Sequence, residues 1–114
     1  MKRNVVITGY GAVSPFGQGV DRLMSALREG RSAVRSMAAE WKDLVRGNAC
    51  LLAAPMDEAI DAAAIPRKQR RCMSRGGILA QLAASDALEQ SGLTRETIES
   101  GRVGAAFGDT IPSA

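Results

Sequence analysis

The chain has 114 residues, a formal net charge of +3 and no histidine, so it lacks the commonest general base near neutral pH and the commonest metal ligand. No segment approaches the ~20 apolar residues that a membrane-spanning helix requires, and we expect a soluble protein. The two cysteines, Cys50 and Cys72, form neither a CxxC pair nor a disulfide pattern, which favours reduced thiols and a cytoplasmic location.

The first half of the chain is predicted to alternate strands and helices. Residues 4–8 contain a continuous β-branched run that is typical of a strand buried on both faces. Apolar residues at helical spacing predict a helix over 20–29, with Gly30 at the position of a C-terminal cap. A shorter helix is expected over 36–45 and a short strand over 50–54.

The second half is predicted to be mainly helical. Residues 56–65 are rich in alanine and are expected to be partly helical up to the interruption at Pro66. The longest helical pattern covers 74–91, and Gly92 provides its stop. We therefore expect the main helix of the chain in this region.

The last predicted elements complete an α/β pattern. Residues 94–100 begin with a partial capping-box signature, and residues 102–108 read as another short buried strand ending at glycine. The order β-α-(α)-β-α-α-β indicates α/β layering with at least two central strands. Two or three strands make a poorly covered sheet, so we expect a segment of a longer protein.

The stretch VVITGYGAVSPFGQG, residues 5–19, contains the end of the first predicted strand and the four glycines that follow it. The dinucleotide fingerprint G-x-G-x-x-G fits Gly9 and Gly11, but its third glycine falls on Ser14. The phosphate loop of nucleotide triphosphatases fails as well, because Gly17 is followed by glutamine rather than by lysine. The remaining interpretation is structural: the glycines allow a strand and a helix to approach closely.

This stretch, with the helix and the Gly-Arg-Ser that follow it, closely resembles the amino terminus of the β-ketoacyl-acyl-carrier-protein synthases, the decarboxylating condensing enzymes of the thiolase superfamily. The later stretches IPRKQRRCMSR, ALEQSGL and RVGAAFGDT agree in the same order, and the resemblance is weakest over 36–64. It implies an α/β, thiolase-like αβαβα layered fold, of which residues 1–114 are the amino-terminal part. It also implies that the glycine loop is structural.

The resemblance places the catalytic residues of the family outside this chain. The family uses a nucleophilic cysteine at a strand–helix turn and two histidines, and all three lie downstream of the segment resembled here. Cys50 and Cys72 are interpreted as buried packing thiols. We therefore expect no catalytic residue, no metal site and no cofactor in residues 1–114.

Five basic residues crowd into residues 67–75. If Pro66 opens a helical turn, Arg67, Lys68 and Arg71 share one face of it. A solvated basic turn is the plain alternative, and nucleic acid is a poor partner because no aromatic residue interleaves the arginines. The resemblance implies that these three residues dock the acidic helix of an acyl carrier protein.

The resemblance also implies a role for Ile111. In the family a residue at this position lines the acyl-chain pocket near the dimer interface. Here Asp109, Thr110 and Pro112 replace the small residues that the family has around it. A plain apolar core contact is the alternative for Ile111.

The function implied by the resemblance is elongation of acyl chains by decarboxylative Claisen condensation of acyl and malonyl thioesters on acyl carrier protein, in fatty acid or polyketide biosynthesis. The alternative is a non-catalytic, synthase-like partner subunit that shapes the acyl pocket. A third interpretation is an independent small protein that binds an acidic partner. The complete enzyme is expected to be a homodimer or a heterodimer with a synthase-like subunit.

Overall fold

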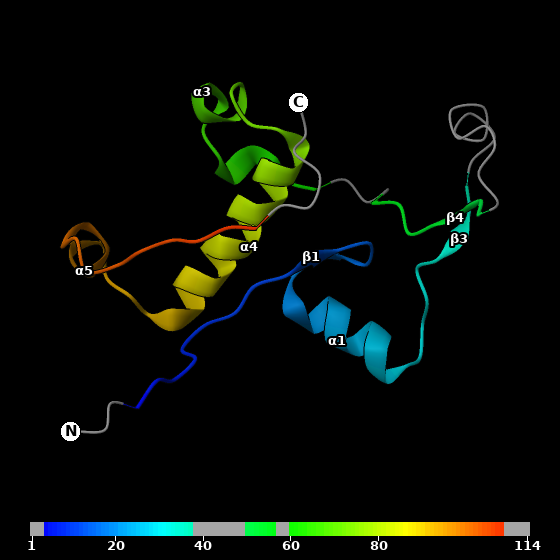
Figure 1. Ribbon diagram of the computed structural model, residues 1–114, viewed down its shortest axis with the longest axis horizontal. Coiled ribbons are helices and arrows are strands. Elements are labelled where there is room, and N and C mark those ends of the chain that lie inside the picture. The colour runs from blue at the N-terminus through cyan, green and yellow to red at the C-terminus, as the bar shows by residue number, and fades with distance from the viewer. Residues whose placement is uncertain (1–3, 38–49, 57–59, 109–114) are drawn as a thin grey trace.

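The computed structural model describes residues 4–37, 50–56 and 60–108 of the chain. The longest helix, α4, lies among the other elements, which extend away from it (Figure 1). The elements in chain order are β1 (Val13–Ser14), β2 (Gly17–Gln18), α1 (Val20–Arg28), β3 (Arg35–Ser36), β4 (Leu52–Ala53), η1 (Ala62–Ala64), α3 (Arg67–Arg70), α4 (Arg75–Ser91) and α5 (Arg95–Glu99).

The ends of α4 are set by local sequence. The Ser74 hydroxyl accepts a hydrogen bond from the backbone N–H of Gly77 at 3.1 Å, as an N-cap residue does. Gly92 ends the helix in the left-handed conformation, with φ of 67°. The predictions of this helix and of its stop are confirmed.

The two shorter helices also follow their predicted signals. Helix α1 covers the predicted range up to Arg28, and Gly30 follows it with φ of 65°. Helix α5 is capped by Thr94, whose hydroxyl accepts from the backbone N–H of Thr97 at 3.2 Å. The partly helical segment before Pro66 is the 3₁₀ turn η1, capped by the Asp61 carboxylate.

The strands of the described residues form two short antiparallel pairs. In the first, Val13 lies opposite Gln18 in β1 and β2. In the second, Arg35 lies opposite Ala53, so the strand expected over 50–54 is present as β4. The helix expected to begin at Ser36 does not begin there, because Ser36 belongs to β3; residues 38–45 lie outside the described ranges.

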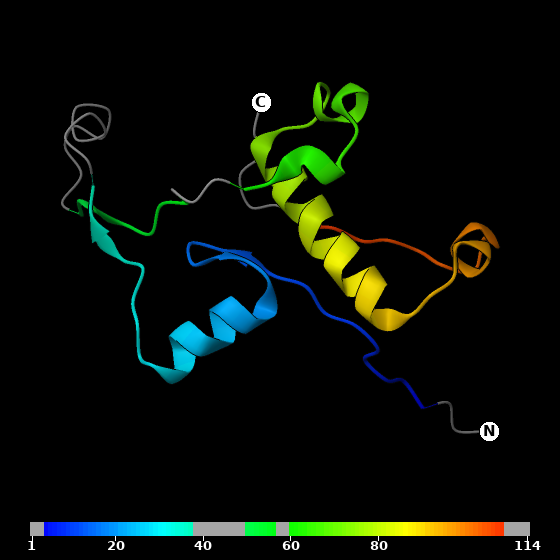
Figure 2. The ribbon, with the colours of Figure 1, turned by 180° about the vertical axis from the view of Figure 1, so that it is seen from behind.

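The strands predicted over 4–8 and 102–108 are wrong for this structure. The segment over 102–108 runs across α4, whereas residues 4–8 lie beyond the carboxyl-terminal end of that helix, and no hydrogen-bonded ladder joins either segment to another described segment (Figures 1 and 2). Val5, Ile7 and Phe107 are 95%, 87% and 72% exposed. A strand forms only where a neighbour accepts its backbone hydrogen bonds, and the described residues supply no such neighbour.

The glycine loop lies against α4. A Cβ atom on Gly9 would overlap the carbonyl oxygen of Ala87, and one on Gly11 would overlap that of Ala83. Close approach of backbone to backbone therefore requires glycine at both positions. The structural interpretation of these glycines is confirmed.

Polar bonds hold the loop in the same place. The Gln18 side-chain amide donates to the Asp86 carboxylate at 3.0 Å, and the Tyr10 backbone N–H donates to the Gln90 side-chain oxygen at 2.8 Å. Both acceptors belong to α4. The register between the loop and the helix is thus fixed by side chains as well as by packing.

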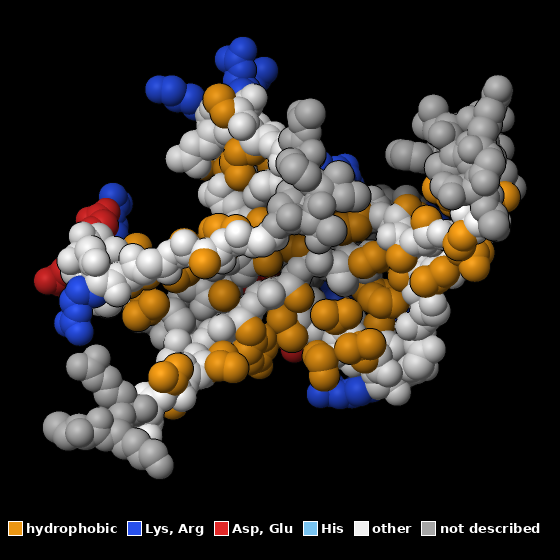
Figure 3. Space-filling model, in the orientation of Figure 1, with side chains coloured by type: hydrophobic (Ala, Val, Ile, Leu, Met, Phe, Trp, Pro, Cys, Tyr) orange, Lys and Arg blue, Asp and Glu red, His pale blue; other side chains and the backbone are white. Residues whose placement is uncertain are grey.

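Few side chains are buried in the described residues. The buried hydrophobic residues of the described ranges are Ala26, Ile65 and Leu82. The chain of 12.0 kDa exposes 9642 Å², whereas a compact monomer of this mass exposes roughly 6,000 Å². Hydrophobic side chains accordingly appear across the face shown in Figure 3. Within the ranges that the structure covers, no helix is long and apolar enough to cross a membrane.

Candidate functional site

The basic segment forms a single helical turn, α3. Pro66 precedes α3 with φ of −54°, and its carbonyl accepts from the N–H groups of Gln69 and Arg70 at 2.9 and 3.1 Å. The N–H of Arg71 donates to the carbonyl of Arg67 at 3.2 Å, so Arg71 continues the turn. The condition on which the shared face depends, that Pro66 opens a helical turn, is therefore met.

Arg67, Lys68 and Arg71 form the exposed face of this turn, which we call the basic face. All three are exposed, and with 100° between successive residues they fall within about 100° of arc. Among the described residues, none of the three side chains makes a hydrogen bond or ion pair. Figure 3 shows Lys and Arg side chains projecting beyond α3 at the top of the view. The basic face is therefore free to meet an acidic partner.

The other two cations of the segment have different environments. Arg75 reaches back and donates from Nη2 to the carbonyl of Met56 at 2.9 Å, which ties the start of α4 to the preceding segment. Arg70 is half-buried, and its Nε is buried without a hydrogen-bond partner. Helical spacing had already left these two out of the basic face, but their contacts depend on tertiary neighbours and could not be predicted from the sequence.

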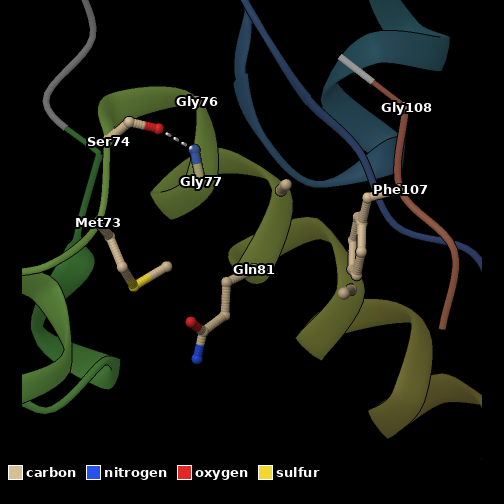
Figure 4. A pocket seen from close by; sticks show the side chains of 9 residues that line it. Met73, Ser74, Gly76, Gly77, Gln81, Phe107 and Gly108 are labelled. Carbon is tan, nitrogen blue, oxygen red and sulfur yellow. Dashed lines mark hydrogen bonds between the residues drawn. The ribbon is translucent and has the colours of Figure 1, made fainter. Parts of the chain in front are cut away.

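An open pocket of about 580 Å³ lies beside the amino-terminal half of α4, next to the basic segment. In Figure 4 the ring of Phe107 stands across the pocket from Met73 and Gln81. The pocket is lined by Met73, Ser74, Gly76, Gly77, Ala80, Gln81, Ala84, Phe107 and Gly108.

Sequence reasoning did not identify this pocket. Its signal is a run of small residues, Gly76, Gly77, Ala80 and Ala84, at helical spacing along one side of α4. Small side chains leave the helix backbone open to whatever packs there. The pocket is mainly a surface of α4 that the segment at Phe107 covers only in part.

The remaining candidate residues have different outcomes. Ile111 lies outside the described residues, so its role stays a prediction. Cys50 and Cys72 are exposed, and the interpretation of both as buried packing thiols is wrong for this structure. No described apolar layer covers either residue: Cys72 follows the exposed turn α3, and Cys50 precedes the short edge strand β4.

The carboxylate of Glu29 lies at the end of α1, away from the basic segment. A hydrogen bond from the Ser25 hydroxyl and the nearby Arg31 guanidinium lower the pKa of Glu29. The same guanidinium lies 5.4 Å from the centroid of the Phe16 ring. This cluster closes the loop after α1 and presents no acceptor to the basic face.

The chain matches a known family model over nearly its whole length. Residues 2–112 match the model described as "Beta-ketoacyl synthase, N-terminal domain". The chain is 35% identical over 108 residues to nodulation protein E of Rhizobium leguminosarum bv. trifolii, covering 95% of this chain and 26% of the relative. It is 34% identical to the granaticin polyketide putative beta-ketoacyl synthase 1 of Streptomyces violaceoruber, covering all of this chain and 26% of the relative.

Two further comparisons agree. The 3-oxoacyl-[acyl-carrier-protein] synthase 1 of Haemophilus influenzae is 28% identical, over 98% of this chain and 27% of the relative. The crystal structure of a beta-ketoacyl synthase from Burkholderia phymatum superposes with a TM-score of 0.69 and 38% identity, over 84% of this chain and 23% of that chain. The chain thus spans about a quarter of the length of the relatives it matches. The predicted fold class, α/β of the thiolase-like αβαβα kind, is confirmed.

Proposed function

Because the chain belongs to the β-ketoacyl synthase family and matches the amino-terminal domain of that family, we propose that residues 1–114 are the incomplete amino-terminal segment of a β-ketoacyl-[acyl-carrier-protein] synthase. The complete enzyme elongates acyl chains by decarboxylative Claisen condensation of acyl and malonyl thioesters. The observation that carries the proposal is the family match over residues 2–112, supported by relatives named as synthases of polyketides and of 3-oxoacyl chains.

The segment contributes framework rather than chemistry in this proposal. Its sequence contains no histidine, so neither cysteine has a histidine of this segment to activate it. The nucleophilic cysteine and two histidines belong to the remainder of the enzyme. The segment supplies α4, the glycine loop packed on it, and the basic face.

The basic face is proposed to dock the acyl carrier protein. Three exposed cations without a side-chain partner among the described residues form a local positive potential, and such a potential accelerates encounter with an acidic protein. The name of the Haemophilus influenzae relative includes the acyl carrier protein, which supports this choice of partner. Ile111 is proposed to line the acyl pocket near a dimer interface, as the family resemblance implies.

The test is transfer of a labelled acyl group from acyl carrier protein to the full-length protein. A synthase retains the label on one cysteine after denaturation and, with malonyl carrier protein, releases CO₂ and the elongated product. Peptide mapping locates the labelled cysteine. Binding of carrier protein without any acyl transfer, in a chain that lacks this cysteine, would instead identify the non-catalytic partner subunit.

A further inference from the structure

The guanidinium of Arg75 joins the two ends of the segment that carries the basic face. Arg75 is the first residue of α4, and its Nη2 donates to the carbonyl oxygen of Met56 at 2.9 Å. The two residues are 19 positions apart in the chain, and η1 and α3 lie between them in sequence. The bond therefore closes a loop that includes α3.

The place of Arg75 in α4 indicates that the arginine serves this loop rather than the helix. A positive charge in the first turn opposes the helix dipole, so the cation does not stabilise α4. The Ser74 hydroxyl already caps the helix by accepting from the N–H of Gly77. A hydrogen bond from a charged donor is stronger than one between neutral groups. The contact that Arg75 makes is therefore the bond to Met56.

Helix α3 has few restraints of its own. It has four residues, and no side chain caps its start. A turn this short has little intrinsic stability. Among the described residues between Met56 and Arg75, Ile65 is the one that is buried, with 2% of its surface exposed. The orientation of α3 therefore depends on how the segment is held at its two ends.

We propose that Arg75 is a positioning residue for docking: its bond to Met56 holds the segment that leads into α3 against the start of α4, and so fixes the direction in which α3 presents the basic face. The inference rests on the proposed docking of an acyl carrier protein. Arg75 binds the backbone of its own chain, so its loss should weaken recognition of the carrier protein only through Arg67, Lys68 and Arg71.

A double-mutant cycle in the full-length enzyme tests this dependence. One arm is Arg75→Met, which keeps an unbranched side chain and removes the donor. The other arm is the basic-face variant, which combines Arg67→Ala, Lys68→Ala and Arg71→Ala. The readout is the ratio of kcat/KM for an acyl group on the carrier protein to kcat/KM for the same acyl group on a short pantetheine thioester. Damage to the fold or to the active site lowers both values and leaves the ratio unchanged.

The expected effect of Arg75→Met differs between the two backgrounds. In the otherwise unchanged enzyme it should lower the ratio about three- to tenfold. In the basic-face variant it should change the ratio by less than about 1.5-fold, because no basic face is left to orient. Arg95→Met is the matched control: it removes an exposed arginine from the first position of α5, where Arg95 pairs with Glu99. This control should leave the ratio within about 1.5-fold of the wild type.

The other outcomes overturn the assignment of Arg75. A loss of the same factor in both backgrounds would make Arg75 an independent contact of the carrier protein. Equal losses with both thioesters would limit Arg75 to supporting the fold, and no loss in the otherwise unchanged enzyme would remove the role. If the basic-face variant itself keeps the wild-type ratio, the docking proposal fails, and the role of Arg75 fails with it.

Discussion

The α-carbon of Gly11 lies so close to the carbonyl oxygen of Ala83 that a Cβ atom on residue 11 would overlap that oxygen. The two residues are 72 positions apart, by the difference of their numbers, and belong to the glycine loop and to α4. This contact gives the loop a structural function. The dinucleotide fingerprint and the phosphate loop both fail on sequence, and the geometry supplies what the glycines do instead.

The first prediction concerns this contact. Gly11→Ala should destabilise the full-length protein by about 1–3 kcal/mol, because a backbone oxygen cannot move aside as the end of a flexible side chain can. The midpoint of chemical denaturation measures the loss. Gly77→Ala is the control within α4, since a Cβ there would meet its nearest neighbour, the Ser74 Oγ, at an ordinary 3.4 Å.

The control variant Gly77→Ala has its own expected change in stability. Gly77 lies in the first turn of α4, where alanine is favoured over glycine by at most the roughly 0.5–1 kcal/mol of a helix interior, so Gly77→Ala should leave stability unchanged or raise it slightly. Equal stability of Gly11→Ala and the wild type would contradict the close packing of the loop on α4.

The second prediction concerns the cap of α4. The Ser74 hydroxyl accepts from the Gly77 N–H at 3.1 Å, so Ser74→Ala should cost about 1 kcal/mol. Ser74→Asp keeps an acceptor and places a negative charge at the helix amino terminus, and it should retain wild-type stability. Thermal denaturation of the full-length protein compares the two. If Ser74→Asp lost as much stability as Ser74→Ala, the loss would not come from the missing hydrogen-bond acceptor, and the capping bond would not be what stabilises α4.

The helices could be predicted from sequence because their signals are local. Ser74 and Gly92 delimit α4 within the same stretch that forms it, and Pro66 opens α3 in the same way. The strand predicted around Val5 is absent from the described structure, because a strand depends on neighbours that are distant in the chain. An apolar run shows that a segment is suited to a sheet, and it does not supply the rest of the sheet.

In the candidate site, too, local features could be predicted from the sequence and tertiary contacts could not. Helical spacing alone placed Arg67, Lys68 and Arg71 on one face, and the structure has them exposed. The bond from Arg75 to the Met56 carbonyl and the burial of Arg70 Nε are tertiary features that no local pattern contains. The environments of Arg70 and Arg75 therefore needed the structure, whereas the grouping of the other three cations did not.

The third prediction concerns docking. Lys68→Glu in the full-length enzyme should lower the association rate with acyl carrier protein about tenfold at low ionic strength, because a steering cation becomes a repelling anion. The difference from the wild type should shrink towards ~1 M salt, where the Debye length is about 3 Å. Stopped-flow or surface-binding kinetics over a salt series measures both effects.

A matched variant tests whether the effect is local. Arg95→Glu changes the net charge by the same amount, at an exposed residue of α5 that pairs with Glu99 at 2.6 Å. This variant should leave the association rate near that of the wild type. A similar slowing in both variants would mean that total charge, rather than the basic face, governs the encounter.

The fourth prediction concerns residues 1–114 as an isolated chain. With 9642 Å² exposed against roughly 6,000 Å² for a compact monomer of its mass, the chain leaves too much apolar surface in water to offset the entropy of ordering its backbone. We expect helical circular dichroism, binding of a hydrophobic dye and no cooperative unfolding transition. Separate melting curves from far-UV and near-UV signals would measure this.

The opposite result would change the function assigned to the chain. Coincident, cooperative transitions would mean that Val5, Ile7 and Phe107 find cover within these residues or in a second copy of them. Sedimentation equilibrium then separates monomer from dimer. A stable monomer would favour an independent binding protein, in which the basic face is the main functional surface. A chain without cooperative unfolding would instead place these apolar residues at contacts with the rest of a synthase, because extended apolar segments are stable only when they are paired and covered.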